Sequence, residues 1–408
     1  MSDNRSYFKS KRFRAILQEY EEADRQDIPC IISSYDYVDV AEYYQDVKND
    51  TEKAERAIDK AVALYPGETG PLIFKGRLML LVHHDIAQTR YYLSCIEDKR
   101  DLDYYYLVAE ILLHEEKVDE ANDYLKEMYE EVNDDERQDY IYDVANIFLD
   151  YFYHEIADEW IQMIDDKEGT DYKELMSKSL VCKGRYEESE ETLNKLIDKD
   201  PFSNDYWNLL TLTQLRSEKN EEALSSSEFS IALNPDDDEA ILNKAYALFQ
   251  MGNVEDSVRF FQRYTELCPD DELGYFNVGS CMIMLNRYEE AWDSLKKAEK
   301  LSPEDSPRYL DIFQNLLYLA EKLEKEKEKV YYIKKIVEYP DDDIQVLIEK
   351  GGIFLYHGLL DKAQEYFNEA VEKSDYATDV IMQIGMMVTD NEYTFNDDGR
   401  LIKMRNRE

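Results

Sequence analysis

The chain has 408 residues, of which 44% are hydrophobic, and only 13 glycines and nine prolines interrupt a composition rich in helix-forming residues. Its 91 acidic and 48 basic residues give a formal net charge of −43, which would repel phosphate backbones and anionic lipid. We therefore expect no binding to nucleic acid or membranes, although the same charge would also suit a surface that is merely soluble.

The five cysteines are widely spaced and form no CxxC motif, a pattern typical of reduced core cysteines rather than of disulfides or a zinc site. The N-terminal segment has no long apolar run, so it predicts neither a signal peptide nor a membrane anchor. No later segment offers the roughly 18 apolar residues that a membrane-spanning helix needs. We therefore expect a cytoplasmic protein.

In chain order, the first predicted element is an amphipathic helix over residues 8–25, which would cap the N-terminal end of the fold. Apolar residues with helical periodicity then recur from about Tyr35 to Tyr376. The last predicted helix, 377–390, is very apolar, so it either covers the preceding helices or forms a dimer contact. We expect the final segment, 391–408, to be loosely ordered.

Prolines mark a fixed period in the middle of the chain. Pro201, Pro235, Pro269 and Pro303 are each 34 residues apart, and each one ends an apolar-periodic run. Proline lacks a backbone N–H and biases the preceding residue away from the helical conformation, so it ends a helix readily. A constant period of this length indicates a stacked array of helical hairpins.

These segments resemble the tetratricopeptide repeat family, whose 34-residue unit is a pair of antiparallel helices, A and B, with small residues where the two touch. With proline at repeat position 32, the residues at positions 8 and 20 of three copies are Thr211, Ala223, Ala245, Ser257, Gly279 and Ala291. In the outer copies they are Ala54, Gly76, Ala109, Ala121, Ala145, Ala157, Ser189, Gly351 and Ala363. Tyr264 stands at position 27, where the family usually has alanine, and predicts locally wider packing.

The resemblance implies an all-α fold, a right-handed α-solenoid of about ten hairpins with terminal capping helices. We divide the chain into an N-terminal capping helix and linker (1–34), the superhelix (35–376), and a C-terminal capping helix with a basic tail (377–408). Pro303 and Pro340 are 37 residues apart, three more than the period. We place the surplus in a lengthened hairpin tip at residues 321–329, EKLEKEKEK.

In this family helix A lines the inner surface, with positions 2, 5, 9 and 12 pointing into it. Carried onto this sequence, that surface is acidic with tyrosines in its first half and apolar in its second half. The residues that we expect to bind a partner are Asp103, Tyr106, Glu110, Asp139, Tyr142, Asn146, Asp171, Asp205, Asn208, Tyr246, Phe249 and Phe276. Plainer explanations remain: acids in a first turn favour the helix dipole, and aromatic residues pack between repeats.

Catalytic and metal motifs are missing from the sequence. The runs PDDD and PDDE lack the alternating acids and the turn glycine of a calcium loop, and they suit N-caps of the following helices. There is no HExxH, phosphate-binding glycine loop or GxSxG elbow. We therefore expect no enzyme, no metal and no cofactor.

Together these features predict a non-enzymatic scaffold or adaptor that binds a polypeptide with basic and apolar residues in the groove of the array. The alternative is a regulatory or sensor subunit that binds a small ligand or peptide between repeats. Two further options concern the chain's own ends. The basic termini would fold into the groove or bridge two chains, and the C-terminal helix would form a homodimer.

Overall fold

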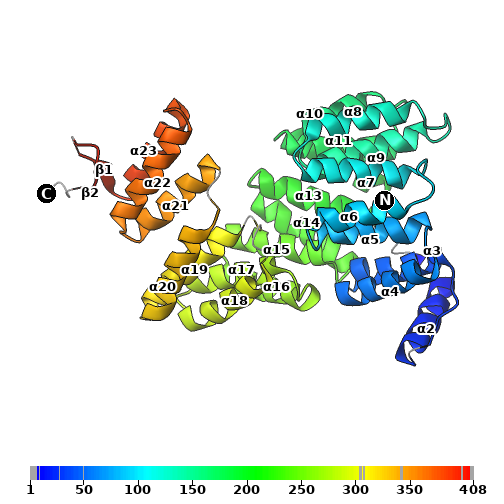
Figure 1. Ribbon diagram of the computed structural model, residues 1–408, viewed down its shortest axis with the longest axis horizontal. Helices are drawn as coiled ribbons and strands as arrows, with labels where there is room; N and C mark the ends of the chain where they lie inside the picture. Colours follow the sequence, from blue (N-terminus) through cyan, green and yellow to red (C-terminus); the bar gives the residue numbers. More distant parts are fainter. Residues whose placement is uncertain are drawn as a thin grey trace. The chain divides into compact units, whose positions relative to one another are not determined.

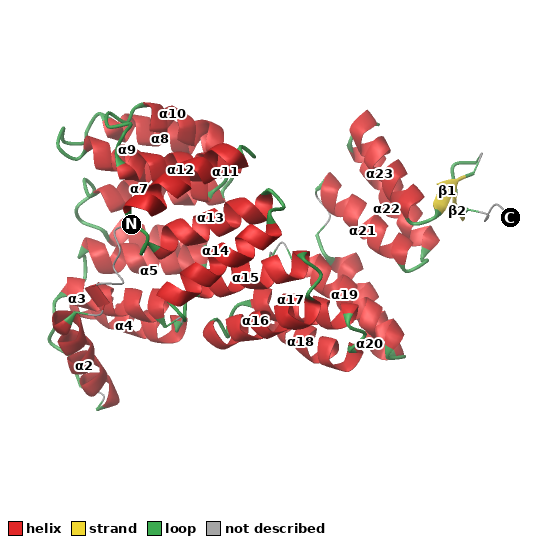
Figure 2. Cartoon of the chain, turned by 180° about the vertical axis from the view of Figure 1, so that it is seen from behind, coloured by secondary structure: helices red, strands yellow, loops and turns green. Residues whose placement is uncertain are grey.

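The computed structural model describes residues 7–8, 10–26, 28–48, 50–302, 306, 308–340, 343–396 and 398–404. Within these residues the chain is almost entirely α-helical, and its only strands form one short hairpin (Figures 1 and 2). The chain divides into two compact units, unit 1 (1–251) and unit 2 (252–408). The predicted all-α fold is confirmed.

Unit 1 starts with helix α2 (Lys11–Arg25) and continues with alternating A and B helices. The A helices are α3 (Ser34–Glu42), α5 (Thr69–Leu81), α7 (Leu102–His114), α9 (Arg137–Asp150), α11 (Thr170–Cys182), α13 (Asn204–Arg216) and α15 (Asp238–Gln250). The B helices are α4 (Thr51–Leu64), α6 (Ile86–Cys95), α8 (Val118–Tyr129), α10 (His154–Gln162), α12 (Tyr186–Lys199) and α14 (Asn220–Leu233). A π-helical turn, η1 (Tyr43–Val47), extends α3.

Unit 2 continues the same alternation. Its helices are α16 (Val254–Leu267), α17 (Glu272–Met284), α18 (Tyr288–Leu301), α19 (Tyr309–Lys322), α20 (Glu326–Glu338), α21 (Ile344–Tyr356), α22 (Leu360–Lys373) and α23 (Thr378–Asp390). Strands β1 (Tyr393–Phe395) and β2 (Leu401–Lys403) follow and pair antiparallel. In chain order, the described helices from α3 to α22 make ten A helices and ten B helices, in agreement with the predicted number of about ten hairpins.

Side-chain caps fix where many A helices begin. Ser203 accepts a hydrogen bond from the backbone N–H of Tyr206, and Asp237 does the same from Ala240. Asp271 and Asp343, from the other aspartate-rich segments, cap α17 and α21 in the same way. Each cap satisfies an N–H that the helix itself leaves without a partner. The aspartate runs therefore act as N-caps, as predicted.

Small residues allow the two helices of a pair to approach closely. Thr211, Ala223 and Ala245 are fully buried, as the repeat pattern requires. At Gly279 an added Cβ would lie 2.5 Å from Cγ of Leu295, well inside ordinary van der Waals contact. A larger residue would fit at this point of the α17–α18 contact only if the Leu295 side chain moved.

Tyr264 shows how the array accepts a large residue at a position that usually holds alanine. Its side chain is buried, and its hydroxyl donates to the Asp271 carboxylate. The neighbouring helix α17 provides the space through Gly274, where an added Cβ would lie 2.8 Å from Cδ1 of Tyr264. A glycine on the adjacent helix thus compensates for the larger side chain.

The predicted hairpin tip at 321–329 is wrong. Helix α19 ends at Lys322 and α20 begins at Glu326, so the link between them is short. The surplus lies instead between Leu301, where α18 ends, and Tyr309, where α19 begins. This link holds two prolines in the sequence, and proline disfavours helix both at its own position and at the one before.

The two ends of the chain pack onto the repeats. Phe13 and Tyr20 of α2 share an apolar cluster with Tyr37 and Ile58 of the first helix pair. The expectation of a loosely ordered tail is wrong for the described residues 391–396 and 398–404, which form the β1–β2 hairpin. Its turn contains Gly399 at a φ of +73°, a conformation natural to glycine, and the backbone N–H of Leu401 donates to Gln364 of α22. The domain boundaries 1–34, 35–376 and 377–408 stay a prediction.

Candidate functional site

The negative charge of the chain is concentrated in one stretch. Residues 101–200, which include helices α7 to α12, hold 31 acidic and ten basic residues, so their net charge is −21. This is about half of the total of −43 in a quarter of the chain. The stretch contains the first seven of the twelve predicted partner-binding residues, from Asp103 to Asp171, and ends with the hairpin α11–α12.

Successive A helices of unit 1 contact one another, from α3–α5 and α5–α7 to α13–α15. The predicted residues on α7, α9, α11, α13 and α15 therefore lie on neighbouring helices of one unit. Phe276 is the exception, because it lies on α17 in unit 2. We use the term acidic face for the carboxylates Asp103, Glu110, Asp139, Asp143, Asp150 and Asp171 on α7, α9 and α11.

One end of the acidic face is neutralised by an arginine from the preceding A helix. Nε of Arg77 on α5 lies 3.2 Å from Oε2 of Glu110, and its Nη2 lies 3.5 Å from Oδ1 of Asp103. Burial raises the pKa of Glu110, and the guanidinium of Arg77 opposes this shift. This ion pair shows that the face can hold a guanidinium group.

The next contact joins α7 to α9. Tyr106 is only 5% exposed, and its hydroxyl donates to Oδ2 of Asp143 at 3.1 Å. Burial, followed by the nearby Asp143 carboxylate, raises the pKa of Tyr106, so this hydroxyl stays protonated. Tyr106 therefore orients the Asp143 carboxylate through this hydrogen bond, and little of the Tyr106 side chain is exposed for contact with a partner.

Between α9 and α11 the contacts are looser. Asn146 donates to the backbone carbonyl of Tyr142, and its Oδ1 accepts a 3.4 Å hydrogen bond from Nζ of Lys178. Lys178 also forms an ion pair with Glu174 at 3.2 Å. Desolvation by the surrounding protein raises the pKa of Asp150, although Lys178 partly offsets the shift. Lys178 thus serves several acceptors at once.

Asp143 and Asp150 were missed by the sequence analysis, which considered only four positions per repeat. A signal was present, since Asp139, Asp143, Asn146 and Asp150 are spaced by four, three and four residues. This spacing places all four on one stripe of α9. Arg77 and Lys178 were also missed as partners, because their contacts join different repeats.

The first-turn acids remain on the surface. Asp139, Asp171 and Asp205 are exposed, each in the first turn of its A helix. This position favours the helix dipole whether or not a partner binds. Asp139, Asp143, Asp150 and Asp171 form no ion pair with any residue that the structure describes. No lysine or arginine side chain among the described residues therefore lies within ion-pair distance of these four carboxylates.

Asn208 is a structural residue in this fold. It is 2% exposed, its Oδ1 accepts from Ser230 at 2.6 Å, and its Nδ2 donates to Oδ1 of Asp237 at 3.1 Å. Because Asp237 caps α15, Asn208 links three successive helices. The amide also reaches Oε2 of Glu239 at 3.3 Å.

The aromatic residues on this side are partly buried. Tyr142 on α9 and Tyr246 and Phe249 on α15 each keep part of their side chain in contact with solvent. Desolvation and nearby carboxylates raise the pKa of Tyr142, so its hydroxyl stays protonated and able to donate. Phe276 has similar partial exposure on its own unit.

Two searches of the described residues bear on other functions. No helix among them is long and apolar enough to cross a membrane. In the same residues, no group of three or more His, Cys, Asp or Glu side chains is placed to hold a metal ion.

A family model matches one part of the chain. Residues 212–272 match the model of the tetratricopeptide repeat. Among solved structures, MamA from Desulfovibrio magneticus is 16% identical with a TM-score of 0.39, over 43% of this chain and 96% of that chain. PilF from Pseudomonas aeruginosa is 14% identical with a TM-score of 0.41, over 53% of this chain and 96% of that chain. No curated protein sequence matches the chain.

The matched segment runs from α13 to the start of α17, and the same close contacts between small residues recur outside it. The repeat register set by Pro201, Pro235 and Pro269 covers this segment. Residues 212–272 therefore contain tetratricopeptide repeats, and the helix pairs on either side of them follow the same pattern.

Proposed function

We propose that the protein is an adaptor whose acidic face binds a basic segment of a partner polypeptide. The observation that carries the proposal is a set of carboxylates that form no ion pair with any described residue: Asp139, Asp143, Asp150 and Asp171. Arg77 and Lys178, on the neighbouring helices α5 and α11, already serve other acceptors.

Desolvation of these carboxylates supports the same proposal. The surrounding protein raises the pKa of both Asp143 and Asp150, even though each side chain reaches solvent. A lysine or arginine from a partner would favour the charged form and lower the pKa of both groups. Binding of a cationic side chain would therefore relieve part of the repulsion between the carboxylates on this face.

The contact between Arg77 and Glu110 is an internal example of the proposed recognition. A guanidinium presents several N–H donors in a planar fork and suits carboxylates better than an ammonium group does. We expect arginine-rich segments to bind more tightly than lysine-rich segments of equal charge. Tyr142, Tyr246 and Phe249 would add apolar contact area for side chains between the basic residues.

The test uses a fluorescently labelled nona-arginine peptide and the full-length chain, with binding followed by anisotropy. The triple variant Asp139→Asn, Asp143→Asn and Asp150→Asn removes three charges from α9 while preserving side-chain size. At roughly 0.5 kcal/mol for each charge pair, we expect binding about tenfold weaker than that of the wild-type chain.

The matched control removes three exposed acids from B helices: Asp123→Asn and Glu127→Gln on α8, and Asp198→Asn on α12. Both triple variants have the same net charge, so a general electrostatic effect would weaken binding equally in the two. We expect the control to stay within about twofold of wild type. Equal losses in both variants would refute the assignment to the acidic face.

A further inference from the structure

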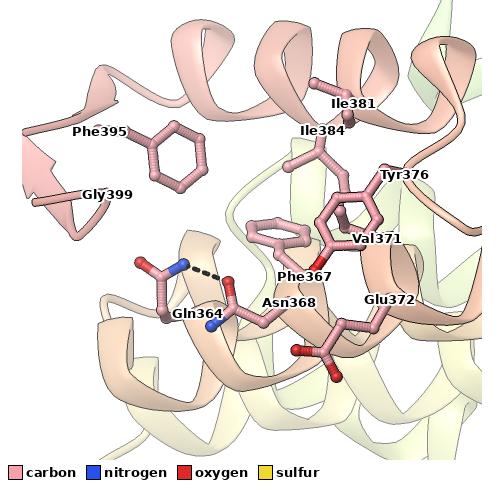
Figure 3. Close-up of a pocket in the computed structure, with 10 residues that line it drawn as sticks. All are labelled: Gln364, Phe367, Asn368, Val371, Glu372, Tyr376, Ile381, Ile384, Phe395 and Gly399. Atoms are coloured by element: carbon pink, nitrogen blue, oxygen red, sulfur yellow. Dashed lines mark hydrogen bonds between the residues drawn. The ribbon is translucent and has the colours of Figure 1, made fainter.

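A second surface, in unit 2, has a different chemical character. A groove of about 470 Å³ opens between α22, α23 and the β1–β2 hairpin (Figure 3). Its apolar lining is Phe367, Val371, Tyr376, Ile381, Ile384 and Phe395. In Figure 3 the α22 side chains form the floor, Ile381 and Ile384 stand above them, and Phe395 and Gly399 close one end.

The preceding repeats show what normally occupies this position. Helix α20 packs against the A helix α19 and also against the B helix α18. Its Tyr332 is fully buried there, with its ring 6.1 Å from the Trp292 ring and 5.8 Å from the Phe313 ring. The Tyr332 hydroxyl accepts a hydrogen bond from Nζ of Lys296 at 3.0 Å and donates one to Oε2 of Glu299 at 3.2 Å.

The residues of α18 that hold Tyr332 have counterparts in α22. Trp292, Lys296 and Glu299 are the fifth, ninth and twelfth residues of α18. The fifth, ninth and twelfth residues of α22 are Gln364, Asn368 and Val371, and all three line the groove. The groove is therefore the place on α22 where the next B helix would pack.

Helix α23 offers the matching surface of an A helix. Its eighth residue is Gly385, the equivalent of Gly351 in α21 and Gly279 in α17. Those two glycines lie against side chains of their own B helices, whereas nothing lies within 4 Å of a Cβ built at Gly385. The segment after α23 forms the β1–β2 hairpin, so it supplies no B helix at this position.

Charge indicates what kind of helix would fit. Residues 360–404 contain ten acidic and four basic residues, and Glu372 lies on the groove itself. A second copy of this region would bring the same negative charge, which disfavours self-association. A helix with basic residues beside its apolar stripe would be complementary.

We propose that this groove docks an amphipathic α-helix of another protein, one with a large apolar or aromatic side chain on its buried stripe and basic residues on either side. The bound helix takes the place of the B helix after α23. Its aromatic side chain fills the groove as Tyr332 fills the space between α18 and α19. This site is separate from the acidic face and shares no residue with it.

The test uses a labelled peptide with the sequence of residues 326–338, the α20 helix that occupies the equivalent place two repeats earlier. The peptide is stapled between positions 326 and 330, both of which are exposed in α20. We expect saturable binding to the full-length chain, and binding at least tenfold weaker when the peptide carries Tyr332→Ala. Absence of saturable binding up to about 1 mM would overturn the proposal.

Two adjacent residues of α23 provide a matched pair of protein variants. Ile381 is 46% exposed and lines the groove, while Met382 is 59% exposed and does not. We expect Ile381→Asp to weaken peptide binding at least tenfold and Met382→Asp to change it by less than about twofold. Equal effects of the two variants would overturn the proposal. A wild-type dimer in light scattering that Ile381→Asp dissociates would also overturn it, because the occupant would then be a second copy.

Discussion

Two glycines at the same position of adjacent A helices should respond in opposite ways to replacement by alanine. Gly351 is the eighth residue of α21 and Gly385 the eighth residue of α23. An added Cβ at Gly351 would lie 2.5 Å from Cδ1 and 3.1 Å from Cζ of Phe367. At Gly385 the same Cβ would meet nothing within 4 Å.

The expected free energies follow from these distances. Alanine is favoured over glycine inside a helix by roughly 1 kcal/mol, and this gain applies at both sites. At Gly351 it competes with overpacking, which costs roughly 1–3 kcal/mol. The upper end applies here, because Phe367 is 1% exposed and a flat ring cannot move one atom away alone. We expect Gly351→Ala to lose about 2 kcal/mol and Gly385→Ala to gain about 1 kcal/mol.

Amide hydrogen exchange is the suitable assay, because repeat arrays open locally and a single global unfolding transition would average over many repeats. The measured quantity is the free energy of opening for amides in α21, α22 and α23. Changes of the same sign in the two variants would refute the reasoning, since they would mean that the space around the eighth residue does not control the outcome.

Two further predictions concern the contacts around α13 and α15. Asn208→Ala removes the buried hydrogen bonds to Ser230 and Asp237, and we expect unfolding of the adjoining helices to become easier by about 3 kcal/mol, measured by the same exchange experiment. Glu239 has its pKa raised from 4.5 to about 7, by desolvation and then by nearby Asp237, so the folded chain binds the proton more tightly than the unfolded chain. The contribution of Glu239 to the free energy of unfolding is therefore full below pH 4.5 and is lost as the pH rises to about 7. In urea denaturation measured over this pH range, Glu239→Gln should remove the fall in unfolding free energy that Glu239 causes.

The repeat architecture could be predicted because it depends on residues that act locally. Proline cannot continue a helix beyond its first turn, and a small residue, such as Thr211, Ala245 or Gly279, is needed at every close contact of this kind. Both therefore recur with the period of the array and are visible in a single sequence. The N-capping aspartates are also local, since Asp237 and Asp271 act within three residues of themselves.

The composition of the candidate site was harder to predict because its contacts cross between repeats. Arg77 and Glu110 are 33 residues apart, and Tyr106 and Asp143 are 37 apart. Nothing in the local spacing distinguishes these residues from other surface charges. Asn208 was expected on the binding surface because its repeat position faces inward in the family, yet its buried partners draw it into the core.

The C-terminal tail and the position of the longer link between helices were mispredicted because their sequences carry no clear periodic pattern. A strand hairpin of three residues per strand has too few residues to show a period-two pattern. The charged residues at 321–329 were expected to lengthen a hairpin tip, but glutamate and lysine favour helix, and most of them belong to the end of α19 and the start of α20. Charge alone therefore did not indicate where the array departs from its period.

The two proposed sites differ in physical character, and salt should separate them. Binding to the acidic face depends on exposed and half-buried charges, whose interactions weaken as the screening length shortens from about 14 Å at 0.05 M salt to about 4 Å at 0.5 M. Binding in the groove of unit 2 depends mainly on apolar contact with Phe367, Val371 and Ile381, which salt does not screen. The nona-arginine peptide should therefore lose at least tenfold in affinity over this range, while the stapled helix loses less than about threefold. If both peptides weakened in parallel, charge would dominate both contacts and the groove would not act as an apolar docking site.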